Sequence, residues 1–199
     1  MIVEDIHMQE LKERIVKEGK VLPGNIIKVD GFLNHRIDTT LLGHIAEEFG
    51  KYFNMDDVTM ILTAEASGIA LATAVAMHYH KPMIFAKKAK SDNIEGGLYQ
   101  SDIFSYTYKK KVTLLVSKEW LSADDKVLII DDFMANGEAM RGLCDIVTAA
   151  GATLVGIGCA VEKGFQGGGD RLRAAGVNLK SLAIIESAEP GHIVFRDDD

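Results

Sequence analysis

The sequence predicts an α/β fold, with an open, twisted, mostly parallel sheet flanked by helices. Strand-like and helix-like patterns alternate through residues 58–175. The run Val127–Ile130 is wholly apolar, as in a strand buried on both faces of a parallel sheet, and it leads through a polar loop into an apolar-periodic helix. The 199 residues are 47% hydrophobic and 26% charged, which is typical of a soluble globular protein. We therefore expect a single domain over residues 1–199.

Composition and charge argue against several classes of protein. No apolar run approaches the length of a membrane span, and the N-terminal residues lack the pattern of a signal peptide, so we expect no membrane association. The net charge of −7 argues against a general nucleic-acid binder. Cys144 and Cys159 both lie in apolar patterns. We expect them to be core residues of a protein in the reducing cytoplasm.

The segment before the sheet is expected to contain two helices and a short strand. The first helix covers Met8–Glu18 and ends at Gly19. A strand is expected around Ile26–Val29, followed by the irregular segment Gly31–His35. The second helix begins after an Asp38 N-cap, and its apolar positions are Leu42, Ile45, Phe49 and Phe53.

The sheet is expected from strands that alternate with helices. Its strands are Val58–Thr63, Met83–Lys87, Val127–Ile130, Thr153–Val161, Ser181–Ser187 and His192–Arg196. Its helices are Ile69–Tyr79, one through Met140–Val147, and Asp170–Ala175. Two further strands, Ser105–Tyr108 and Val112–Ser117, are expected to form an antiparallel ribbon that carries a loop. We expect Trp120 to be a packing residue.

Two consecutive carboxylates, Asp131 and Asp132, follow the Val127–Ile130 strand. At the carboxyl end of a parallel strand, the N–H groups of a glycine-containing loop and the helix dipole favour an anion, while carboxylates accept hydrogen bonds from sugar hydroxyls. The pattern is therefore typical of a sugar-phosphate site. A Walker B strand can also end in two acids, but the sequence contains no G-x-x-x-x-G-K-[ST] motif. The other alternative is an ordinary strand whose acids are solvated.

The run from Val127 to Met140 resembles the phosphoribosyl diphosphate (PRPP) motif of the type I phosphoribosyltransferases. The Asn136–Gly137 loop and the flanking segments are most similar to the xanthine-specific members, and the likeness extends over nearly the whole chain. The resemblance implies transfer of 5-phosphoribosyl from PRPP to xanthine, giving xanthosine 5′-monophosphate and diphosphate. It also implies Mg²⁺ bound through PRPP, with no protein metal site, and a homodimer. Guanine or hypoxanthine is the alternative base, and an adenine transferase is a further alternative within the family.

The resemblance implies that Asp131 and Asp132 hold the ribose hydroxyls. It implies that the 5-phosphate lies in a loop made of Ala135, Asn136, Gly137, Glu138 and Ala139. This loop departs from the commoner pattern. Asn136 and Ala139 stand where threonine is usual, and Ala135 stands where some hypoxanthine and guanine enzymes have an aspartate. Glu138 replaces a neutral amide, and a carboxylate beside a phosphate is unfavourable unless it turns outward.

The diphosphate is expected between a turn and a basic strand end. The resemblance assigns it to the turn of Glu65, Ala66 and Ser67, and to Lys87 and Lys88. From the residues alone, the turn could equally be a tight connection that needs small side chains, and the lysines could be a solvated face. We also expect the segment Lys88–Ser105 to act as a cationic flap.

The resemblance implies that the purine contacts Ile27, Asn34, Phe133 and Lys163, under a hood formed by about residues 20–37 and 180–199. A cationic Lys163 would favour an ionised base and bind its 6-oxo group. For Asn34 alone, a turn residue that caps local backbone is the simpler interpretation.

The rival from another class is a purine regulator that binds PRPP without catalysis. Such regulators carry a helix-turn-helix domain ahead of this fold, whereas only a short helix is expected here before the hood, and the chain is acidic. We therefore expect no binding of nucleic acid.

Overall fold

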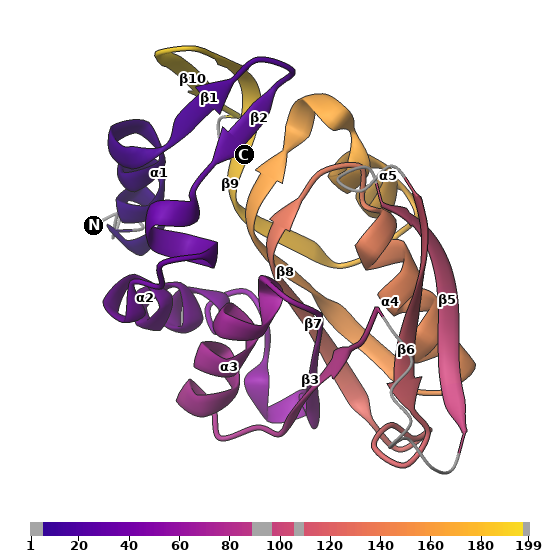
Figure 1. The fold of residues 1–199 in the computed structure, drawn as a ribbon. Helices are drawn as coiled ribbons and strands as arrows, with labels where there is room; N and C mark the ends of the chain where they lie inside the picture. The colour runs from indigo at the N-terminus through magenta and orange to yellow at the C-terminus, as the bar shows by residue number, and fades with distance from the viewer. Residues whose placement is uncertain (1–5, 89–96, 106–109, 197–199) are drawn as a thin grey trace.

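The computed structural model describes residues 6–88, 97–105 and 110–196. Its centre is a six-stranded sheet in the order β10-β9-β8-β7-β3-β4 (Figure 1). The strands are β3 (Met60–Ala64), β4 (Met83–Ala86), β7 (Lys126–Met134), β8 (Thr153–Lys163), β9 (Leu179–Glu189) and β10 (His192–Phe195). All neighbours pair in parallel except β9 and β10, which are antiparallel. The expected mostly parallel α/β sheet is confirmed.

Helices cover both faces of this sheet (Figure 1). Side chains that alternate along β7 point to opposite faces, so Leu128 and Ile130 join one core while Val127 and Ile129 join the other. The first core is covered by α1 (Ile6–Glu18), α2 (Thr39–Phe49) and α3 (Gly68–His78). The second is covered by α4 (Glu138–Ala149). This two-sided burial explains the continuous apolar run of the central strand.

A two-stranded hairpin, β5–β6, packs on α4. It pairs β5 (Leu98–Ser105) with β6 (Lys110–Ser117), so the expected ribbon is present but begins at Leu98, not at Ser105. Residues 98–105 of the segment expected to act as a flap therefore form a strand, while residues 89–96 and 106–109 lie outside the described part. The inward positions of β5 include Ser101, whose hydroxyl donates to Asp145 Oδ2 at 2.8 Å. This polar residue at a buried position interrupts the alternation of apolar and polar residues that predicts a strand.

The N-terminal segment forms a second small hairpin, β1–β2, which lies beside β9 (Figure 1). It consists of β1 (Lys20–Leu22), which the sequence did not predict, and β2 (Ile26–Lys28). A single turn of π-helix, Asp30–Asn34, replaces the expected irregular segment. Asp38 is the N-cap of α2 as expected, accepting from the backbone N–H groups of Thr40 and Leu41.

Three shorter elements complete the fold. They are the 3₁₀ turns Met55–Asp57 and Gly164–Gln166 and the helix α5 (Gly168–Ala174). Trp120 is 60% exposed, so the expectation that it packs in the interior is wrong. Within the described residues, no helix is long and apolar enough to cross a membrane.

Candidate active site

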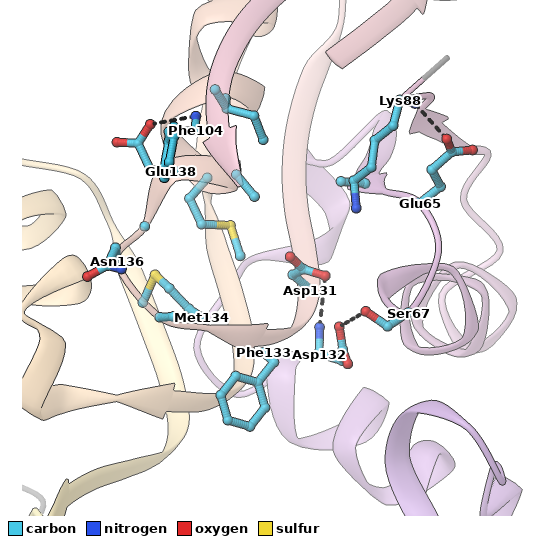
Figure 2. A pocket seen from close by; sticks show the side chains of 16 residues that line it. Glu65, Ser67, Lys88, Phe104, Asp131, Asp132, Phe133, Met134, Asn136 and Glu138 are labelled. Atoms are coloured by element: carbon cyan, nitrogen blue, oxygen red, sulfur yellow. Dashed lines mark hydrogen bonds between the residues drawn. The ribbon is translucent and has the colours of Figure 1, made fainter. Parts of the chain in front are cut away.

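A cavity of about 200 Å³ opens at the carboxyl end of the sheet, between β3, β7 and the hairpin β5–β6 (Figure 2). It is lined by Ala64, Glu65, Ser67, Lys88, Ile103, Phe104, Asp131, Asp132, Phe133, Met134, Ala135, Asn136, Gly137, Glu138, Ala139 and Met140. Ligands of open parallel sheets bind at this end of the strands. The structure therefore gathers the acid pair, the following loop and part of the expected diphosphate turn around one space.

The acid pair Asp131 and Asp132 is held inside β7, which continues past it to Met134. Both acids are buried, at 7% and 1% exposure, so the interpretation of solvated acids is wrong. The backbone N–H of Asp132 donates to Asp131 Oδ1 at 3.1 Å. Burial, and then the neighbouring charge of Asp132, raise the pKa of Asp131 well above its ordinary value.

Asp132 receives two side-chain hydrogen bonds from other elements. Ser67 Oγ donates to Asp132 Oδ1, and Asn34 Nδ2 donates to Asp132 Oδ2, each at 2.9 Å. Asn34 is therefore bonded to the acid pair and is not a local backbone cap, and it is not among the described residues lining the cavity. Ser67, from the turn before α3, and Asn34, from the π-helical turn, hold one carboxylate of the pair in a fixed orientation.

The loop 135–139 joins β7 to α4 and lines the cavity throughout. Gly137 is the N-cap of α4 with φ of +76°, and among the described residues no side chain caps the helix there. Glycine adopts this left-handed backbone without the strain that a Cβ would cause. The first N–H groups of α4 are thus left for an anion, together with the positive end of the helix dipole.

Glu138 turns away from this loop toward the hairpin. Its Oε2 accepts from the Phe104 backbone N–H at 3.3 Å (Figure 2). The same oxygen accepts from Arg141 at 3.2 Å. The Arg141 guanidinium holds the pKa of the Glu138 carboxyl below its ordinary value, so the group stays ionised. The expected conflict between this carboxylate and a phosphate is reduced because the charge is paired outside the loop.

The expected diphosphate residues divide into two groups. Glu65, Ser67 and Lys88 line the cavity, and Glu65 Oε1 accepts from the backbone N–H of Lys88 at 2.6 Å (Figure 2). Ala66 lies in the same turn, but it is not among the described residues lining the cavity. Lys87 pairs with Leu115 of β6 and lines a separate cavity beside Trp120. The structure does not bring Lys87 to the site.

The expected base residues are also only partly assembled. Phe133 lines the cavity, and the Lys163 ammonium lies 5.4 Å from the centroid of its ring. Lys163 Nζ donates to the backbone oxygen of Asn25 at 3.0 Å, and burial lowers the pKa of this lysine. Ile27 is 7% exposed and packs in the first core, so its side chain is not brought to the described cavity lining.

The profile of the phosphoribosyl transferase domain matches residues 34–177. The chain belongs to the phosphoribosyltransferase family. Proteins named xanthine phosphoribosyltransferase, from Bifidobacterium animalis subsp. lactis and Lachnoclostridium phytofermentans, are 52% and 51% identical to it over 192 and 193 residues. The alignments cover 95% and 96% of this chain and 100% of each relative.

The fold of this phosphoribosyltransferase is also similar to that of adenine phosphoribosyltransferase from Saccharomyces cerevisiae. The two agree with a TM-score of 0.74 at 18% identity, over 89% of this chain and 98% of the yeast chain. Sequence reasoning missed several residues that line the phosphoribosyltransferase cavity, namely Ala64, Ile103, Phe104, Met134 and Met140. Ile103 and Phe104 reach it only because the hairpin β5–β6 packs on α4, a contact between segments far apart in sequence.

Proposed function

We propose that this protein transfers the 5-phosphoribosyl group of PRPP to xanthine, giving xanthosine 5′-monophosphate and diphosphate. The observation that carries the proposal is the acid pair and uncapped helix N-terminus around one cavity, in a chain half identical to named xanthine phosphoribosyltransferases over their full length. The bond from the anomeric carbon to diphosphate breaks and its electron pair leaves with diphosphate. Xanthine is bound as its anion, its ring proton having left to solvent, and the ionised ring nitrogen bonds to that carbon.

Asp131 and Asp132 accept hydrogen bonds from the ribose hydroxyls and offset the positive charge that develops on the sugar ring. Ser67 and Asn34 keep Asp132 oriented for this task, since each donates to one of its carboxylate oxygens. The N–H groups of the 135–139 loop hold the 5-phosphate, and Lys88 and Ser67 lie near the leaving diphosphate.

Mg²⁺ fits this site as an ion that arrives with PRPP. Mg²⁺ prefers hard oxygen ligands, which the phosphate and sugar oxygens of PRPP would supply beside the acid pair. Bound in this way, the ion neutralises charge on the diphosphate. A homodimer in the cytoplasm, as the family resemblance implies, completes the proposal.

Xanthine is favoured over adenine by the cation of Lys163. An ammonium donates to a 6-oxo group and has no acceptor for an amino group, and one unpaired polar contact lowers the specificity constant roughly a hundredfold. Lys163 and Phe133 lie together, which supports a base that lies against the ring with its 6-oxo group directed at the ammonium. The ammonium donates to Asn25 O and would exchange that oxygen for the one on the purine.

Diphosphate release from PRPP and Mg²⁺ tests the proposal with a panel of xanthine, guanine, hypoxanthine and adenine. We expect xanthine to have the highest kcat/KM and adenine to be a very poor substrate. A higher value for guanine or hypoxanthine would contradict the choice of base. Release with none of the four bases, despite PRPP binding, would favour the regulator that senses PRPP without catalysis.

A further inference from the structure

Gly168, the middle one of three consecutive glycines, lies against the 135–139 loop. A Cβ on Gly168 would lie 2.4 Å from Ala135 O and 2.6 Å from both Asn136 C and Gly137 N. Real side chains do not approach backbone this closely, so the first turn of α5 reaches the loop only because Gly168 has no side chain. The face of the Asn136–Gly137 peptide is therefore covered by the backbone of α5.

Arg171 extends from α5 to the same peptide. Its guanidinium donates to Asn136 O at 3.0 Å and to Gln166 O at 3.4 Å, which joins the loop to the 3₁₀ turn before α5. Arg171 is exposed, and the described residues lining the cavity do not include it. It approaches the 135–139 loop from outside the cavity.

The orientation of one loop N–H follows from this contact. The Asn136–Gly137 peptide bond is trans. The C=O and N–H of a planar trans peptide point in opposite directions. Because Arg171 holds Asn136 O outside the cavity, the Gly137 N–H points away from Arg171. This is the peptide that leads into the uncapped N-terminus of α4.

We propose that Arg171 is a positioning residue for the 5-phosphate site: with Gly168 behind the peptide, it holds the Asn136–Gly137 peptide so that the Gly137 N–H faces the bound phosphate. This inference rests on the proposed function, since it takes the loop as the 5-phosphate site. The positive charge of Arg171 also lies within electrostatic range of the loop, because it contributes, after Arg141, to lowering the pKa of Glu138. Its main action is geometric, since a peptide free to rotate would present its carbonyl oxygen to the phosphate for part of the time.

Isothermal titration with Mg²⁺ and no base tests the proposal with three ligands: PRPP, ribose 5-phosphate and diphosphate. Arg171→Met keeps the length of the side chain but removes the guanidinium. We expect it to weaken PRPP and ribose 5-phosphate about tenfold, the effect of one misdirected charge-assisted hydrogen bond, and to leave diphosphate binding unchanged. Equal weakening of all three ligands, or of none, would overturn the proposal.

Two further variants and one control separate the effect of geometry from that of charge. Arg171→Lys keeps the charge but loses the planar fork that spans Asn136 O and Gln166 O, so a full return to wild-type affinity would mean that charge alone acts and would overturn the proposal. Gly168→Ala displaces the loop backbone and should weaken the binding of PRPP and ribose 5-phosphate. The control Gly43→Ala in α2, whose Cβ meets open space among the described atoms, should change the binding of neither ligand. If Gly168→Ala does not fold, the binding constants of Arg171→Met and Arg171→Lys decide the proposal.

The same titrations distinguish the inference from the proposed function. If wild-type protein binds neither PRPP nor ribose 5-phosphate, the proposed function fails. If it binds both and the Arg171 variants bind them as tightly, only the positioning role fails.

Discussion

At the scale of single residues, the two acids of the pair have different environments although they are adjacent in the chain. Asp132 receives hydrogen bonds from the side chains of Ser67 and Asn34, whereas Asp131 accepts from the backbone N–H of its neighbour and is buried beside a second carboxylate. Ionisation of Asp131 is therefore unfavourable, and its raised pKa expresses that penalty. The positive charge of the transition state would relieve it.

The first prediction compares the two neutral replacements. Asp131→Asn should leave the unliganded protein at least as stable as wild type at neutral pH, because it removes a buried charge and keeps an acceptor for the Asp132 N–H. Asp132→Asn should cost roughly 1–3 kcal/mol, because its new NH₂ group faces the Ser67 or Asn34 donor. Both should lower kcat by orders of magnitude.

Urea unfolding monitored by circular dichroism, together with diphosphate release, measures both effects. A folded double variant with nearly native transferase activity would disprove the assignment of sugar binding to the acid pair. Equal stability losses in the two single variants would contradict the difference in environment.

The second prediction concerns the base residues. Lys163→Ala should lower kcat/KM for xanthine, and its stability cost should be small because its hydrogen-bond acceptor is an exposed backbone oxygen of a turn. Asn34→Ala should lower xanthine use through Asp132 as well as through the base, since it removes one donor to that carboxylate. It should also narrow the gap between xanthine and hypoxanthine. Steady-state kinetics with both bases measure this, and an unchanged ratio in Asn34→Ala would restrict Asn34 to orienting Asp132.

At the scale of elements, the position of the hairpin β5–β6 depends on α4. Arg141 of this helix donates to Asp102 O at 2.8 Å and to Asp145 Oδ2 at 2.7 Å, while Glu138 accepts from the Phe104 N–H. Below these polar contacts, Gly142 lets the hairpin approach, since a Cβ there would lie 2.5 Å from Ile103 Cγ2. The wall of the cavity formed by Ile103 and Phe104 is thus fixed by packing on the helix.

The third prediction uses a matched pair of helix glycines. Gly142→Ala should destabilise the protein by roughly 1–3 kcal/mol through overpacking against Ile103 and Leu114. Gly43→Ala in α2 should instead stabilise it by roughly 0.5–1 kcal/mol, because its Cβ meets open space among the described atoms and alanine favours the helix. Thermal unfolding of the two variants checks the signs. Stabilisation by Gly142→Ala would show that the hairpin does not pack here as described.

At the scale of the whole molecule, Arg196, which follows the last strand of the sheet, is bonded to the helix that carries Arg171. Arg196, just after β10, contacts Asp170 of α5 at 2.7 and 3.2 Å and Glu186 of β9 at 2.9 Å. This contact, chiefly the hydrogen bond from Arg196, lowers the pKa of Asp170 from its ordinary value of 3.8. The antiparallel edge of the sheet and α5 are therefore joined by a charged pair at the surface.

The fourth prediction follows from the sign of that shift. A lowered folded pKa means that the pair stabilises the protein above pH 3.8 and that this contribution is lost as the pH falls through the lower, folded value. Asp170→Asn should therefore cost roughly 0.5–1 kcal/mol at pH 7, a small amount because the pair is partly exposed, and the difference from wild type should shrink below about pH 4. Urea unfolding across this range checks it. A difference that grew on acidification would contradict the assignment.

The sequence by itself determined most of the fold and the centre of the site. The buried run Val127–Ile130, the acid pair and the 135–139 loop are contiguous, so hydrophobic periodicity and local backbone preferences were enough to predict a strand, a turn and a helix in the right order. The N-cap Asp38 was predictable for the same reason, since it bonds to residues two and three positions along the chain.

Only the tertiary structure decided where side chains from distant segments point. Lys87 and Lys88 are neighbours, yet successive side chains leave a strand end on opposite sides, and only Lys88 lines the cavity. Ile27 is held in the core by packing, and Asn34 is held to Asp132 across 98 positions of sequence. The start of β5 was not predicted because a polar residue, Ser101, occupies one of its buried positions. Its hydroxyl is satisfied there by Asp145 of α4. Such partners are set by the three-dimensional packing of the chain, which local periodicity does not encode.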